Sequence, residues 1–89
     1  MNKIWNAIND DTRRKILALL KFKKMAVSEI VSHFKITQPT VSHHLSVLKS
    51  AGLVECSKIA QSMVYSINNN AFNTFLEYFS SLFGLKIVK

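Results

Sequence analysis

Cysteine, proline and glycine are scarce in this 89-residue chain, which contains one, one and two of them. A single cysteine, Cys56, leaves no internal disulfide, no CxxC metal pair and no dithiol redox pair within the chain. So few prolines and glycines also leave no flexible linker between domains. A chain of this length has room for one hydrophobic core, and we therefore expect residues 1–89 to form a single domain.

Long apolar runs are missing as well. No run approaches the ~20 residues of a membrane-spanning helix, and the first residues lack the basic-then-apolar order of a secretion signal. We therefore expect a cytoplasmic protein without membrane insertion. Paired carboxylates, a Ser-His-Asp arrangement and a glycine-rich phosphate loop are also missing, so we do not expect an enzyme.

Acidic residues are few, with 5 Asp and Glu against 12 Lys and Arg and a formal net charge of +7. Such an excess suits a polyanionic partner, either nucleic acid or an anionic membrane surface. Membrane-surface binding would place lysines along the flank of an amphipathic helix. The most apolar segment, residues 71–83, has no lysine, so the charge favours nucleic acid.

Apolar spacing in the first half of the chain predicts three helices. Ile4, Trp5 and Ile8 mark the first. A second begins at the polar cluster 9–12, with Asn9 as its cap, and ends near residues 21–24. Apolar residues at i, i+3, i+4 and i+7 predict a third helix from about Val27 to Phe34.

Capping and turn residues predict the helices and strands in the second half of the chain. Thr37 is placed as an N-cap and Pro39 lies in the first turn, so a fourth helix runs to about Ser50, where Gly52 ends it. Two β-prone runs, residues 53–59 and 63–67, predict a hairpin, and residues 68–70 begin a last helix. The predicted fold is mainly α with a β-hairpin wing, a winged helix-turn-helix in the order ααααββα.

Two motifs resemble those of the ArsR/SmtB-type repressors. The stretch from Thr40 to Val54, TVSHHLSVLKSAGLV, is similar to that family's recognition-helix pattern of S-x-H-L, a later Leu, and A-G-L-V. Asp11 to Leu17, DTRRKIL, resembles its D-P-T-R-x-x-I-L motif, with Asp11 in place of the proline. The resemblance covers nearly the whole chain. It implies a transcriptional regulator of double-stranded DNA, a homodimeric repressor that reads a palindromic operator through helix 38–50.

Short polar side chains near the start of a recognition helix reach base edges and phosphates in the major groove. The predicted contacts from this helix are Gln38, Thr40, Ser42 and His43. His44 lies nearer the buried face, and we expect it to have a structural role. The predicted wing tip consists of residues 60–62. On the wing, we expect Lys58, Gln61 and Ser62 to contact the phosphates of the DNA backbone. Arg13 and Arg14 are predicted either to touch flanking phosphates or to keep the surface soluble.

Metal sensing is not expected, although many members of that family bind a metal that releases DNA. Residues 25–30 contain no cysteine, and residues 71–83 contain no histidine and one carboxylate, Glu77, so the ligands of such a site are missing. We expect no metal and no other cofactor. The resemblance is therefore to the branch without a metal sensor, whose members act as autorepressors or answer to a regulatory protein partner.

The apolar residues at the two ends of the chain predict a dimer interface, in which two recognition helices about 34 Å apart read a palindrome. The predicted interface residues are Ile4, Trp5, Ile8, Phe72, Phe75, Phe79 and Phe83. The alternative is that these residues pack only within their own subunit. An alternative function is a winged-helix module that binds proteins, against which the net charge and the polar stretch 38–43 argue.

Overall fold

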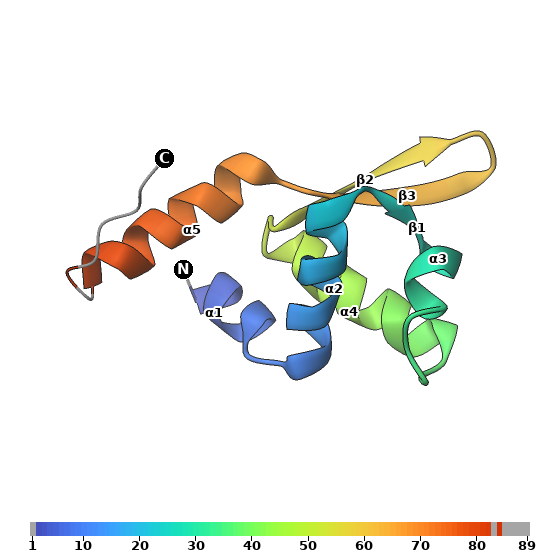
Figure 1. Cartoon of the computed structure of the whole chain (residues 1–89), viewed down its shortest axis with the longest axis horizontal. Coiled ribbons are helices and arrows are strands. Elements are labelled where there is room, and N and C mark those ends of the chain that lie inside the picture. The colour runs from blue at the N-terminus through green and yellow to red at the C-terminus, as the bar shows by residue number, and fades with distance from the viewer. Residues whose placement is uncertain (1, 83, 85–89) are drawn as a thin grey trace.

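Five helices and three strands are formed by the residues that the structure, a computed structural model, describes, namely 2–82 and 84 (Figure 1). In chain order they are α1 (Asn2–Ile8), α2 (Asp11–Phe22), β1 (Met25–Ala26), α3 (Val27–Val31), α4 (Gln38–Ser50), β2 (Val54–Ile59), β3 (Ser62–Ile67) and α5 (Asn69–Leu82). The predicted winged helix-turn-helix is confirmed, and β1 is added to the predicted order.

The wing is part of a three-stranded antiparallel sheet in the order β1-β3-β2. The prediction of a two-stranded hairpin missed β1, because two residues are too few to show an alternating pattern. Ile59 pairs with Ser62, so the turn consists of Ala60 and Gln61 alone, and the predicted tip was one residue too long. Ala60 has a φ of +55°, a left-handed conformation that is costly for alanine.

Helix boundaries depend on capping side chains, and two of the predicted boundaries were wrong. The cap of α2 is Asp10 and not Asn9, because the Asp10 carboxylate accepts the backbone N–H of Arg13 at 3.0 Å. Helix α3 ends at Val31. Phe34 still packs against the core from the turn that follows, so the apolar spacing continues beyond the end of the helix.

Two other boundaries are confirmed. The Thr37 hydroxyl caps α4 by accepting the backbone N–H of Thr40 at 3.4 Å. Gly52, just beyond the end of α4, has a φ of +79°, a conformation that glycine adopts without a steric penalty. Together these residues fix both ends of the helix on which the predicted DNA contacts lie.

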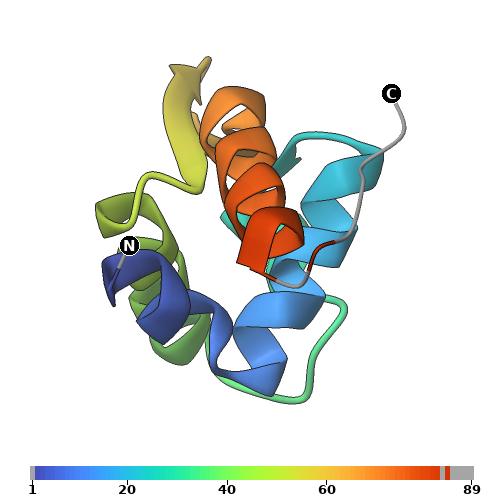
Figure 2. The ribbon, with the colours of Figure 1, turned by 90° about the vertical axis from the view of Figure 1, so that its left-hand side faces the viewer.

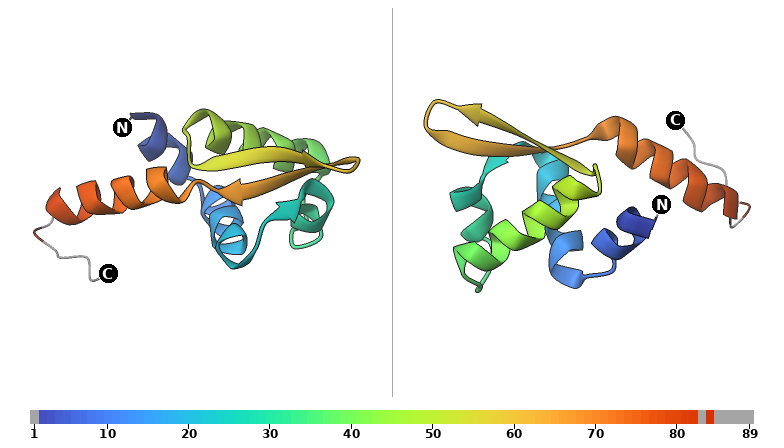
Figure 3. Two further views of the ribbon diagram at one scale, coloured as in Figure 1. Left: turned by 90° about the horizontal axis from the view of Figure 1, so that it is seen from above. Right: turned by 180° about the vertical axis from the view of Figure 1, so that it is seen from behind.

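The hydrophobic core lies between α2, α3, α4 and the base of the sheet. Ile16, Ile30, Leu45 and Leu48 have no exposed surface. From this core the wing and α5 extend in opposite directions, as the views from the front and from above show (Figures 1 and 3), and the molecule measures 43 × 23 × 20 Å. Seen from the end that carries α5, α1 lies beside that helix (Figure 2).

Candidate nucleic-acid interface

Helix α4 separates buried apolar residues from exposed polar ones. Val41, Leu45 and Leu48 are completely buried. The four residues predicted to contact bases, Gln38, Thr40, Ser42 and His43, are all exposed. The structure therefore brings them together on the solvent side of the first two turns, where an α-helix enters a major groove.

The start of α4 is held by side chains as well as by the backbone. The hydroxyl oxygens of Thr37 and Thr40 lie 2.9 Å apart and share a hydrogen bond. Pro39 occupies the first turn, where its fixed φ suits a helix and its missing N–H leaves no donor unpaired. These contacts keep the exposed polar side chains on a fixed backbone.

Arg13 joins three helices through its guanidinium group. Its Nε donates to the carbonyl oxygen of Ala7 at 2.7 Å, and its NH2 donates to that of Asn6 at 3.0 Å. Its NH1 lies 3.2 Å from Nδ1 of His44. All three guanidinium nitrogens thus have partners inside the protein. The prediction of a structural role for His44 is confirmed, because this half-buried ring links α4 to the start of α2.

Arg14 lies in the next position but is more exposed. Its NH1 donates to the carbonyl oxygen of Ile8 at 2.7 Å, and its NH2 lies 3.8 Å from the carboxylate of Asp11. Because 54% of the Arg14 side chain is exposed, this ion pair adds little stability. Arg14 is therefore available to an incoming phosphate, whereas Arg13 is engaged within the protein.

The wing approaches the start of α4. A groove of about 220 Å³ is lined by Ala26, Val27, Ser28, Gln38, Ser62 and Met63. It brings two predicted contacts, Gln38 of α4 and Ser62 of the wing, to one place. No local sequence pattern predicts this groove, because β1 and the start of α3 supply half of its lining.

Apolar side chains are exposed on the wing, where the predictions named only polar ones. Lys58, Gln61 and Ser62 are exposed as expected. Ile59 and Met63 are also 46% and 45% exposed. Nearer the core, Cys56 of β2 pairs with Tyr65 of β3. The pKa of the Tyr65 hydroxyl is raised, mainly by burial and to a smaller extent by the neighbouring Cys56 thiol.

The predicted interface residues of α1 and α5 meet within one chain. Trp5 contacts Phe75 edge-on, with ring centroids 5.3 Å apart, and the Trp5 and Phe79 centroids lie 6.0 Å apart. Phe72 packs against the core, with the Lys21 ammonium 5.8 Å from its ring centroid. Phe83 lies outside the described residues. This packing within the chain occupies one side of the predicted interface, and contact across a two-fold axis stays a prediction.

Other apolar side chains of α5 remain exposed. The exposed fractions are 36% for Leu76, 41% for Tyr78 and 57% for Leu82. No helix among the described residues is long and apolar enough to cross a membrane. Within residues 2–82 and 84, no three His, Cys, Asp or Glu side chains gather where they could hold a metal ion.

The fold and the exposed recognition helix define a winged-helix DNA-binding protein, and the similarity of this chain to known proteins agrees with that class. The family described as "Bacterial regulatory protein, arsR family" matches residues 10–55, the segment from the cap of α2 to the start of the wing. The chain belongs to this family. It is a DNA-binding transcriptional regulator and not a winged-helix module that binds only proteins.

Individual relatives are named as regulators, not as enzymes. The transcriptional repressor SdpR of Bacillus subtilis is 46% identical over 68 residues, which cover 76% of each chain. The arsenical resistance operon repressor of Staphylococcus xylosus is 31% identical and covers 88% of this chain and 71% of its own. The solved structure of HlyU from Vibrio cholerae is similar, with a TM-score of 0.75, 28% identity and coverage of 90% of this chain and 87% of its own. HlyU is named a transcriptional activator.

Proposed function

We propose that this protein is a homodimeric transcriptional repressor that reads a palindromic operator with the first half of α4. The observation that carries the proposal is the row of exposed polar side chains above fully buried Val41 and Leu45. Gln38 has the amide that pairs with adenine, and His43 donates to the acceptors of guanine. Thr40 and Ser42 donate to phosphate or base oxygens.

Contacts to the DNA backbone come from the residues around α4. On this proposal Arg14 binds a flanking phosphate, and Lys58, Gln61 and Ser62 follow the backbone beside the wing. Arg13 acts indirectly, because its guanidinium is engaged with α1 and with His44. The wing of this protein contributes little charge, since Lys58 is the only basic residue of β2 and β3.

Dimerisation would cover the apolar surface that α5 leaves exposed. This helix extends away from the core (Figure 1), and its side chains Leu76, Tyr78 and Leu82 are exposed among the residues that the structure describes. Exposed apolar side chains of this kind mark an interaction surface. A second copy is the simplest partner, because one copy reads only one half of a palindrome.

A regulator of this kind acts where the chromosome lies, in the cytoplasm, and needs no catalytic group, metal or other cofactor. Its release from DNA would then follow its own concentration or a regulatory protein partner. We therefore expect DNA affinity to be the same with Zn²⁺ and with EDTA.

The test is a fluorescence-anisotropy titration of a duplex from the region upstream of the protein's own gene, against a scrambled duplex, at several salt concentrations. We expect tighter binding to the upstream duplex. The variants Gln38→Ala and Gln61→Ala form a matched pair, because both glutamines are exposed. The first should reduce discrimination between the duplexes by about 5- to 150-fold, the effect of one base contact. The second should weaken binding to both duplexes alike.

Two further measurements separate the parts of the proposal. Sedimentation should show a dimer that Leu76→Lys dissociates, whereas Phe22→Lys, at an 88% exposed side chain away from α5, should leave the dimer intact. A reporter gene behind the upstream region should be less active when the protein is present. Increased transcription would make the protein an activator, and absence of DNA binding at low salt would refute the function itself.

A further inference from the structure

The polar face of α4 continues beyond the residues that would read bases. Ser42, Ser46 and Lys49 are separated by four and three positions, so they lie on one face of the helix, and all three are exposed. Helix α4 contains no acidic residue. An anion that contacts the first half of the helix therefore meets no negative side chain along the second half.

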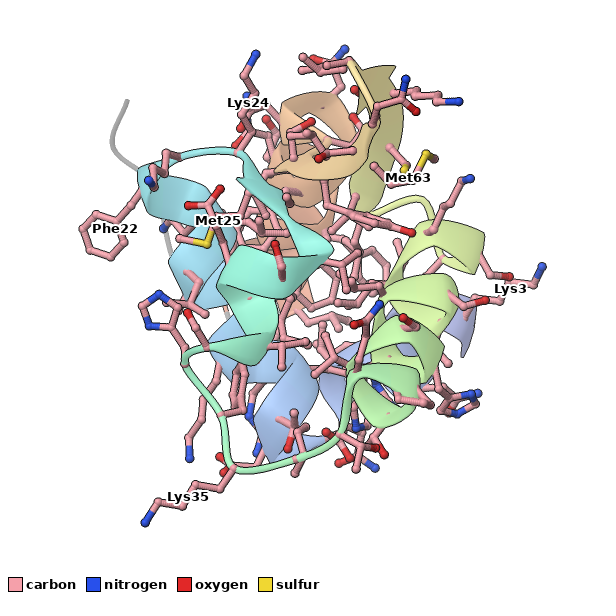
Figure 4. All side chains as sticks on the ribbon, turned by 90° about the vertical axis from the view of Figure 1, so that its right-hand side faces the viewer. Lys3, Phe22, Lys24, Met25, Lys35 and Met63 are labelled. Atoms are coloured by element: carbon pink, nitrogen blue, oxygen red, sulfur yellow. The ribbon has the colours of Figure 1, made fainter. Side chains whose placement is uncertain are left out.

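A groove lies where this second half meets α1. It has a volume of about 330 Å³ and is lined by Lys3, Asn6, Ser46, Val47, Ser50 and Ala51. The view onto the wing end of the molecule shows Lys3 beside α4, at the edge opposite Phe22 and Lys35 (Figure 4). The groove is therefore on the same side of the molecule as the exposed face of α4.

The groups that line this groove suit a phosphodiester. An ammonium, an amide and two hydroxyls supply hydrogen-bond donors, and no carboxylate lies among them. Within the part of the chain that the structure describes, Lys15 and Lys23 form ion pairs with Asp11 and Glu29. Neither Lys3 nor Lys49 is paired with a carboxylate there, so both charges are available to a ligand.

We propose that this groove, together with Lys49, binds the phosphodiester backbone of the operator beyond the bases that the first half of α4 reads. The proposal rests on the proposed function, because it assumes that α4 enters a major groove. A helix whose first turns are in the groove presents its later turns to the phosphates that border the groove. Lys3 adds a cation from a different helix, so α1 and α4 would hold the same strand.

Salt dependence provides the test, because each phosphate contact contributes about 0.9 to the slope of log affinity against log salt concentration. The full chain is titrated with the upstream duplex and with its scrambled counterpart. We expect Lys3→Gln and Lys49→Gln each to lower the slope by about 0.9 and to weaken binding about fivefold at 0.15 M salt. The loss should be equal for both duplexes, since a phosphate contact carries no sequence information.

The matched control is Lys35→Gln, which removes the same charge at the opposite edge of the molecule (Figure 4). It should leave the slope unchanged. Since Lys3, Lys35 and Lys49 are all exposed, the three variants should share the wild-type melting temperature. Equal slopes for Lys3→Gln and Lys35→Gln would overturn the proposal. A Lys3→Gln or Lys49→Gln variant that changes dimer dissociation but leaves the salt slope unchanged would overturn it as well. Wild-type protein that fails to bind either duplex would refute the proposed function, and this inference with it.

Discussion

Replacing Arg13 with alanine removes a side chain from the first turn of α2 that hydrogen-bonds to α1 and contacts His44 of α4. The Ala7 and Asn6 carbonyls belong to the last turn of α1, where the helix itself supplies no donors, and of the two the Asn6 oxygen also accepts the backbone N–H of Asn9 at 3.3 Å. Hydrogen bonds to charged groups contribute about 1.5–3 kcal/mol each. The bond to Asn6 is exposed, so water replaces much of it, whereas the bond to Ala7 is partly buried. We therefore expect Arg13→Ala to lower the free energy of unfolding by about 2–3 kcal/mol.

Thermal denaturation followed by circular dichroism measures this loss. For a chain of this size, 2–3 kcal/mol corresponds to a fall in Tm of about 10–20 °C. Arg14→Ala is the matched control, because Arg14 also donates to one carbonyl of α1 but is 54% exposed, and it should cost less than about 1 kcal/mol. Equal and small losses for the two variants would refute the structural role assigned to Arg13.

Substitutions at four further positions test individual features of the fold by the same method. Asp10→Ala should cost about 1 kcal/mol by removing the cap of α2. The hydrogen bond from the Arg13 backbone N–H holds the pKa of the Asp10 carboxyl below its ordinary value of 3.8. The charged cap therefore stabilises the folded protein fully above pH 3.8, and this stabilisation is lost as the pH falls through the lowered pKa. The stability advantage over Asp10→Asn should shrink in that range, and a constant difference would contradict the charge effect. Gly52→Ala should cost about 1–2 kcal/mol through its φ of +79° alone, because no atom lies within 4 Å of the added methyl group. Ala60→Gly, at a φ of +55°, should instead be neutral or stabilising by up to about 1 kcal/mol, and a clear loss would count against the left-handed turn. Leu45→Ala, in the fully buried core, should cost about 2–5 kcal/mol, and a smaller loss would mean that Leu45 is not enclosed.

Local signals were sufficient for much of the fold. Thr37, Pro39 and Gly52 fix the two ends of α4 because capping and left-handed conformations depend on residues a few positions apart. The same signals failed where two candidates compete locally. Asn9 and Asp10 are both good caps, and only the backbone geometry decides that Asp10 accepts the Arg13 N–H.

Contacts between distant segments were beyond local reasoning. Strand β1 exists because Met25 and Ala26 meet Tyr65 and Val64, and no local pattern in two residues predicts such pairing. The link between Arg13 and His44 spans 31 positions. Arg13 and Arg14 were predicted either to touch phosphates or to keep the surface soluble, and the tertiary structure instead engages Arg13 with α1 and α4.

The sequence alone determined the order of the helices, the polar face of α4 and the family, because helical periodicity, capping residues and motif spacing are all local properties of the chain. Only the tertiary structure decided which exposed cations remain available. It engaged Arg13 with α1 and α4, placed Lys3 beside Ser46 and Ser50, and left Leu76, Tyr78 and Leu82 of α5 exposed. Burial and hydrogen bonding depend on which segments contact one another in the folded protein, and residue spacing along the chain does not predict those contacts.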